Sequence, residues 1–137
     1  MLHDPERVAE VRAWRAKAEA DLRAGEHGLL AAPPFTGDAM FHAQQAAEKA
    51  VKALLTWHDV PFRKTRDLTE IGRQCIAVDT SLEDVCRRAE RLTVFAWLFR
   101  YPGDVEEPPL EETRQALTLA RDVCEAILSR LPAQVRP

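Results

Sequence analysis

The sequence of 137 residues has little of what builds sheets, membrane spans or export signals. It contains 5 glycines, and no segment alternates polar and apolar residues over a useful length, so no β-sheet is expected. No run reaches the roughly 18 apolar residues of a membrane span, and the charged N-terminus lacks the apolar stretch of a secretory signal. Alanine, leucine, glutamate and arginine dominate instead, and these residues favour helices. We therefore expect an all-α protein with no membrane partner.

Motifs for metal, cofactor or nucleophile chemistry are also missing. The three cysteines, Cys75, Cys86 and Cys124, are odd in number and have no CxxC spacing, which favours reduced, buried thiols in a cytoplasmic protein. No glycine-rich phosphate loop, HExxH or GxSxG motif is present, so we assign no metal, no cofactor and no catalytic residue. The net charge of -3 gives no strong field for binding nucleic acid.

Helix-breaking residues divide the chain into helical segments. Asp4 and Pro5 predict the start of a first helix, which ends before Pro33 and Pro34. Further helices are expected over about 38–58, about 68–78 after an Asp67 or Thr65 cap, from a Ser81–Asp84 capping box to the end of "VFAWLF" at about residue 99, and between Pro109 and Pro132. The last residues, 133–137, are expected to be a frayed tail. The whole chain, 1–137, is predicted to form one domain, an up-and-down antiparallel bundle of four to five helices.

The segment "FHAQQAAEKAVKALL" predicts the central helix of this bundle. Its broad apolar side consists mostly of alanines, which let neighbouring helices approach closely. Phe41 and Leu55 fall instead on the polar side, where they indicate either an interface with a second copy of the chain or a loop folded over them. The apolar stretch "VFAWLF" must also be covered, which adds Phe95, Trp97 and Phe99 to the interface candidates.

His42, Gln45, Lys49 and Lys52 lie within one arc of about 80° on this helix. Such a strip of cations and hydrogen-bonding groups could hold a phosphate or a nucleotide. The alternative is a solvated helix face, with Glu48 and Lys52 as an ordinary i,i+4 ion pair.

Four motifs in this order resemble the HEPN domain family: "AEADL", "HAQQAAEKA", "KTRDL" and "RYP". The resemblance implies an α-helical bundle, commonly a homodimer, often encoded beside a small nucleotidyltransferase as a toxin–antitoxin-like pair. Several branches of the family are metal-independent RNases, and nucleotide binding has been proposed for others.

Some residues match the family's motifs and others depart from them. The nuclease signature, an Arg followed four to six residues later by a His, is absent. Arg66 stands where relatives commonly have a His, which keeps a cation but removes a group that titrates near neutral pH. Arg100 and Tyr101 match the family's "RYP", so they and Lys64 join the candidate phosphate-binding residues, although Arg100 and Pro102 could simply end a helix.

Three functions follow from these observations. The first is a binding module: a helical homodimer that pairs with a nucleotidyltransferase and binds a nucleotide, with RNA made less favourable by the acidic segment "GDVEEPPLEE". The second is an RNase that uses Arg100 with Tyr101 or His42, and the missing His argues against it. The third is a module that only assembles with itself. The first is the preferred reading, and the chain is not expected to be an enzyme.

Overall fold

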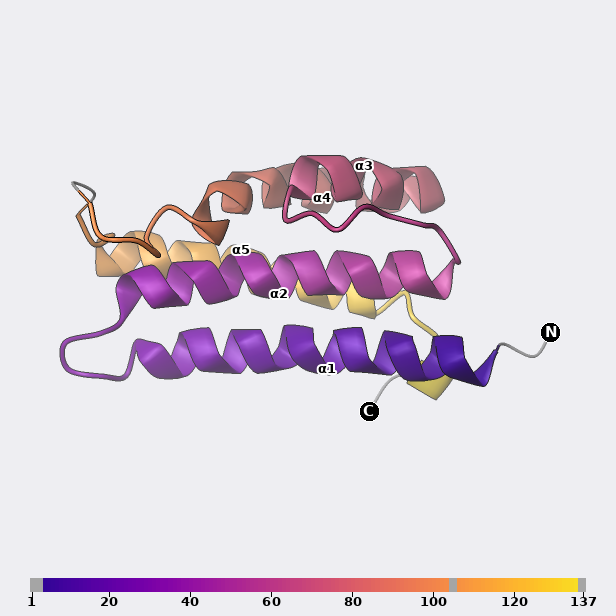
Figure 1. The fold of residues 1–137 in the computed structure, drawn as a ribbon, viewed down its shortest axis with the longest axis horizontal. Coiled ribbons are helices and arrows are strands. Elements are labelled where there is room, and N and C mark those ends of the chain that lie inside the picture. The colour runs from indigo at the N-terminus through magenta and orange to yellow at the C-terminus, as the bar shows by residue number, and fades with distance from the viewer. Residues whose placement is uncertain (1–3, 104–105, 136–137) are drawn as a thin grey trace.

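The computed structural model describes residues 4–103 and 106–135, which are helical throughout their regular structure. The α-helices are α1 (Pro5–Gly28), α2 (Thr36–Trp57), α3 (Leu68–Val78), α4 (Glu83–Ala89) and α5 (Leu110–Leu128); the 3-10 helices are η1 (Thr80–Leu82), η2 (Glu90–Ala96) and η3 (Ala133–Val135) (Figure 1). No strand occurs in these two ranges, and the predicted all-α bundle is confirmed.

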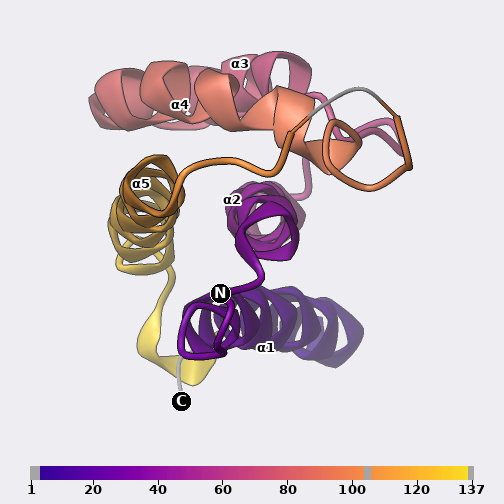
Figure 2. The same cartoon turned by 90° about the vertical axis from the view of Figure 1, so that its left-hand side faces the viewer.

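Helix α2 is the centre of the bundle, as its alanines predict. In Figure 2, α1 lies below α2, α5 lies to one side, and α3 and α4 form a layer above. Ala43, Ala46, Ala47 and Ala50 are fully buried, so the neighbouring helices pack directly against the α2 backbone. The close approach also requires a glycine in α1, since a Cβ on Gly25 would lie 2.7 Å from Leu117 Cδ2 and 3.5 Å from the Ala39 carbonyl oxygen.

The connection between α2 and α3 runs back along α2 before α3 begins (Figure 1). The Val60 amide donates to the Leu55 carbonyl (2.9 Å) at its start, and the Gln44 side-chain amide donates to the Arg66 carbonyl (3.0 Å) near its end. Leu55, whose carbonyl holds the start of this returning segment, has no exposed surface. The segment also carries Arg66 back beside the N-terminal half of α2.

Two predicted helix starts are confirmed and one is shifted. Asp4 and Asp67 accept hydrogen bonds from the amides of Glu6 (3.0 Å) and Thr69 (2.9 Å), as N-caps do. Helix α2 begins at Thr36 rather than near residue 38, and its N-cap residue offers no side-chain acceptor. Glu107, just before α5, takes that place by accepting from the Gly37 amide (2.8 Å).

The fourth helix differs most from its prediction. The expected Ser81–Asp84 capping box does not form, because Asp79 accepts from both the amide (3.0 Å) and the hydroxyl (2.6 Å) of Ser81. Helix α4 therefore follows a 3-10 turn, has 7 residues, and continues as the 3-10 helix η2. The apolar segment 94–99, at the end of η2 and after it, is not fully covered by the chain, since Val94 and Trp97 are 37% and 51% exposed.

The predicted frayed tail is also corrected over the part that the structure describes. Val135 in η3 is fully buried, and its carbonyl accepts from Arg15 Nε (2.7 Å), while Arg12 binds the Gln134 carbonyl. Residues 136–137 lie outside the described residues.

Two further expectations concern the cysteines and the membrane. Cys75, Cys86 and Cys124 are buried free thiols, as predicted. Among the described helices, none combines the length and the apolar character that crossing a membrane requires.

Candidate functional site

Two arginines from distant parts of the chain meet on the ring of Phe41. The guanidinium carbon of Arg100 lies 3.9 Å from the ring centroid, and that of Arg66 lies 5.8 Å from it. Arg66 comes from the segment that returns along α2, and Arg100 from the turn after η2. Both arginines are exposed, and neither forms an ion pair with a carboxylate in residues 4–103 and 106–135. We call these three residues the arginine–phenylalanine cluster.

Hydrogen bonds fix both arginine-bearing segments. The Arg66 carbonyl is held by Gln44 (3.0 Å), and the next residues are held by the Asp67 cap and by a bond from the Leu68 amide to Thr93 Oγ1 (3.1 Å). The Arg100 amide donates to the Trp97 carbonyl (3.1 Å), which closes the last turn before the loop. The two cations are therefore presented by ordered backbone rather than by a free loop end.

A second polar group joins α1 to α2 beside this cluster. Asp21 in α1 accepts from His42 Nδ1 (2.8 Å) and from Lys49 Nζ (2.5 Å), and His42 Nε2 lies 3.4 Å from Asp38. Burial opposes ionisation of Asp21, but the hydrogen bonds from His42 and Lys49 outweigh it and lower the pKa of its carboxyl. The hydrogen bond to Asp21 raises the pKa of His42 above 6.5 despite partial burial. His42 and Lys49 are thus neutralised within the chain.

A third group occupies the buried middle of α2. Glu48 accepts from Lys52 Nζ (3.1 Å), from the Gln44 amide (3.2 Å) and from the Gln45 amide (3.4 Å). The Lys52 ammonium lies 5.5 Å from the ring centroid of Trp14 and 5.7 Å from that of Phe62. The Glu48 and Lys52 side chains are only 6% and 7% exposed. The predicted solvated face is therefore wrong for these residues, although the predicted Glu48–Lys52 pair is present.

The eight candidate binding residues thus separate into three environments. His42 and Lys49 are paired with Asp21, and Gln45 and Lys52 belong to the buried network. Arg66 and Arg100 stack on Phe41. Lys64 and Tyr101 are exposed, Tyr101 to 75%.

The five interface candidates also differ from one another in exposure. Trp97 is half exposed, while Phe41, Phe95 and Phe99 are partly buried. Phe95 and Phe99 stack with ring centroids 5.9 Å apart. Leu55 is fully buried within the chain, so it has no exposed surface to offer a second copy.

Acidic residues that the sequence analysis did not select shape this region. Asp21 was detectable, because it falls on the buried stripe of α1 with Val11, Ala18 and Gly25, where a charge needs a buried partner. Glu107 had no such signal, since its contact with α2 depends on the path of the loop. A hollow of about 420 Å³ lies here, bordered by Asp38 and Glu107 as well as by Phe41 and Arg100.

The site offers guanidinium donors and an aromatic ring, but little for metal or acid–base chemistry. No group of three or more His, Cys, Asp or Glu side chains suited to a metal ion occurs among the residues that the structure describes. One imidazole, that of His42, lies beside the cluster, with its ring centroid 5.6 Å from that of Phe41. A cluster of this kind suits binding of a phosphate or carboxylate.

Fold and site together define a small, all-helical domain built around one buried helix with an anion-attracting cluster at one edge. The model of the HEPN domain family matches residues 11–131, nearly the whole chain, and the protein belongs to that family. Comparison with curated proteins and with solved structures finds no match.

Proposed function

We propose that this HEPN protein is a binding module that holds a phosphate-bearing nucleotide at the arginine–phenylalanine cluster. The observation that carries the proposal is the pair of exposed guanidinium groups on Phe41, unpaired within the described residues. A guanidinium stacked on an aromatic ring keeps its N–H donors around its edge, where they can bind phosphate oxygens in pairs. Two cations held near one ring also repel each other, and a bound anion would relieve that repulsion.

The test is a thermal-shift titration with ATP, AMP and inorganic pyrophosphate. A ligand that binds only the folded protein raises its melting temperature, by an amount set by its concentration relative to Kd. We expect a rise with wild-type protein and none with Arg66→Ala/Arg100→Ala. Arg73→Ala, which removes an exposed arginine from α3, should keep the rise. An equal rise in all three proteins would show binding elsewhere and contradict the proposed site.

The module is further proposed to act as a homodimer. Support comes from the exposed apolar side chains of Val94 and Trp97, which lie in the same segment as the stacked and partly buried Phe95 and Phe99. Sedimentation velocity should show a dimer that Trp97→Asp dissociates, while Ala16→Asp on the exposed face of α1 leaves it intact. A monomeric wild-type protein at micromolar concentration would contradict this part of the proposal.

The protein partner is proposed to be a minimal nucleotidyltransferase, and the support for this is the family alone. Co-expression of the chain with a nucleotidyltransferase encoded beside its gene should give a complex on size-exclusion chromatography. Separate elution of the two proteins at micromolar concentration would count against the pairing.

One contact favours RNase activity as a second candidate function. The ring of Phe41 touches both the Arg100 guanidinium and the imidazole of His42, so a cation and a proton donor lie near one point. The raised pKa of His42 suits it as an acid, whereas cleavage at a 2′-hydroxyl also needs a base. Cleavage of a short RNA in the presence of EDTA, lost in both His42→Gln and Arg100→Ala, would establish the enzyme. Intact RNA would leave the binding module.

A further inference from the structure

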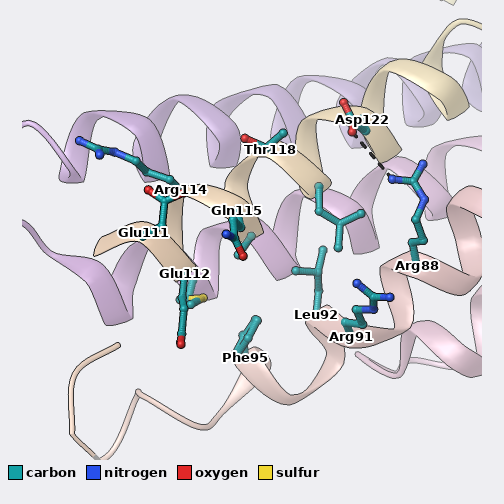
Figure 3. A pocket seen from close by; sticks show the side chains of 13 residues that line it. Arg88, Arg91, Leu92, Phe95, Glu111, Glu112, Arg114, Gln115, Thr118 and Asp122 are labelled. Carbon is teal, nitrogen blue, oxygen red and sulfur yellow. Dashed lines mark ion pairs between the residues drawn. The ribbon is translucent and has the colours of Figure 1, made fainter. Parts of the chain in front are cut away.

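A groove between two helical segments is lined by none of the residues of the arginine–phenylalanine cluster. It has a volume of about 480 Å³ and runs between α5 and the α4–η2 segment (Figure 3). Met40, Leu92, Phe95, Ala116 and Leu119 supply its apolar surface. Met40 comes from α2, so the floor of the groove is continuous with the buried core.

The two walls of the groove carry opposite charge. Arg88 and Arg91 stand on the α4–η2 side, and Glu111, Glu112, Asp122 and one cation, Arg114, stand on the α5 side, which is therefore acidic on balance (Figure 3). Arg88 reaches across to Asp122 at 3.9 Å and closes one end. Arg91, Glu111 and Glu112 form no ion pair within residues 4–103 and 106–135, so the open part faces unpaired basic charge on one side and two unpaired carboxylates, with Arg114 between them and Asp122 in the sequence, on the other.

The shape of the groove selects a convex occupant. Two copies of the groove placed face to face would leave both apolar floors unfilled. The exposed apolar side chains along the middle of α1 are the short ones of Ala9, Ala13, Ala16 and Ala20, so α1 of a second copy has no large apolar side chain there to offer. A helix with larger apolar side chains, lying between the two walls, would fill the groove as ridges fill grooves in helix packing.

We propose that this groove binds an amphipathic helix of a partner protein. The wall formed by α5 from Glu111 to Asp122 spans about 16 Å, which corresponds to about three helical turns. The helix presents an apolar stripe to Leu92, Phe95 and Leu119, an acidic edge to Arg91, and a basic edge to Glu111 and Glu112. The inference rests on the proposed role as a binding module, and it uses none of the residues of the arginine–phenylalanine cluster.

The experiment uses three fluorescent helical peptides of 14 residues with the same leucine stripe. One peptide has glutamates along one edge and lysines along the other, the second has glutamates on both edges, and the third has lysines on both. Fluorescence anisotropy with the full chain should show the mixed peptide binding about tenfold more tightly than either single-sign peptide, because each of those places one edge against a like charge.

Charge reversal in the exposed walls should change this preference without disturbing the fold. Arg91→Glu makes both walls acidic, so the all-lysine peptide should become the tightest ligand. Glu111→Lys/Glu112→Lys makes both basic and should favour the all-glutamate peptide. Arg73→Glu on α3 lies outside the groove and should keep the wild-type order.

Several results would overturn the proposal. Equal affinity for the three peptides, no binding, or an order unchanged by Arg91→Glu would each exclude the groove as a helix site. A dimer that Arg91→Glu dissociates would assign the groove to a second copy of the chain. The groove proposal and the phosphate-site proposal are tested independently, because Arg91→Glu should leave the thermal shift with ATP unchanged.

Discussion

Replacing Lys52 with methionine tests the polar network at the centre of α2. The Lys52 ammonium lies 3.1 Å from Glu48 Oε2, and both side chains are more than nine-tenths buried. Methionine keeps much of the length and the apolar stem of lysine but removes its charge. The Glu48 carboxylate would then retain only the amides of Gln44 and Gln45 as partners.

The expected loss follows from the burial of the charge left behind. Removing one partner of a buried ion pair costs about 3–5 kcal/mol, a large part of the roughly 5–15 kcal/mol that stabilises a typical domain. At this chain length each kcal/mol lowers the melting temperature by about 3–5 °C, so Lys52→Met should melt at least about 10 °C lower. Glu48→Gln/Lys52→Met leaves no charge and should recover all but about 1 kcal/mol.

Urea unfolding followed by circular dichroism at pH 7 measures these free energies. Lys17→Met, on the exposed face of α1, is the matched control and should change stability by less than about 0.5 kcal/mol. The reasoning is refuted if Lys52→Met costs less than about 1 kcal/mol, or if the double variant is as unstable as the single one. A small loss would mean that water reaches the Glu48 carboxylate, whereas an equally unstable double variant would mean that the loss comes from packing and not from the buried charge.

Three smaller perturbations test other parts of the structure. Glu107→Gln should lower the free energy of unfolding by about 0.5–1 kcal/mol, because a carboxylate is lost at the N-terminus of α2. An unchanged free energy in urea unfolding would contradict the capping role of Glu107. The bond to Asp21 raises the pKa of His42 above 6.5, so its stabilisation is complete below pH 6.5 and is lost as the pH rises through the folded-state pKa. Unfolding free energies should therefore fall above pH 6.5 in wild type but not in His42→Gln, and an NMR titration should place the His42 pKa above 6.5. Gly25→Ala should destabilise the bundle although alanine favours helices, because its Cβ meets Leu117; a raised melting temperature would show that Leu117 moves freely.

Much of the fold could be predicted because its signals are local. The caps at Asp4 and Asp67 follow from residue type next to a helical pattern, and the alanine side of α2 follows from periodicity. The Ser81–Asp84 box failed because Asp79, two residues earlier, accepts from the Ser81 amide that Asp84 would otherwise bind, and also from the Ser81 hydroxyl. A sequence pattern cannot decide between two acceptors that are both within reach.

The candidate site was harder to predict because a helical arc does not say what covers it. His42, Gln45, Lys49 and Lys52 share one arc of α2, yet different segments cover its two halves. Asp21 from α1 neutralises one half, and Trp14 with the returning segment buries the other. The one sequence feature that indicated the pairing of His42 and Lys49 was Asp21 itself, a charge on the buried stripe of α1.

The position of Arg66 beside Phe41 could not be predicted from the sequence either. Nothing in "KTRDL" places this residue beside Phe41, because the intervening segment could leave α2 in any direction. It turns back because Val60 and Arg66 are both bonded to α2, the first through the Leu55 carbonyl and the second through Gln44. Long-range pairing of this kind depends on the assembled bundle.

The pairing of the cations also bounds the ligand that the cluster could hold. With His42, Lys49 and Lys52 neutralised inside the chain, an anion on Phe41 would meet chiefly the two guanidinium groups of Arg66 and Arg100. Asp38 and Glu107 border the adjacent hollow and would repel further phosphates. For a single strand, the logarithm of the binding constant falls with the logarithm of salt concentration by about 0.7 for each phosphate neutralised. Two arginines therefore predict a slope no steeper than about -1.4, which favours a small nucleotide over a polynucleotide that needs many such contacts.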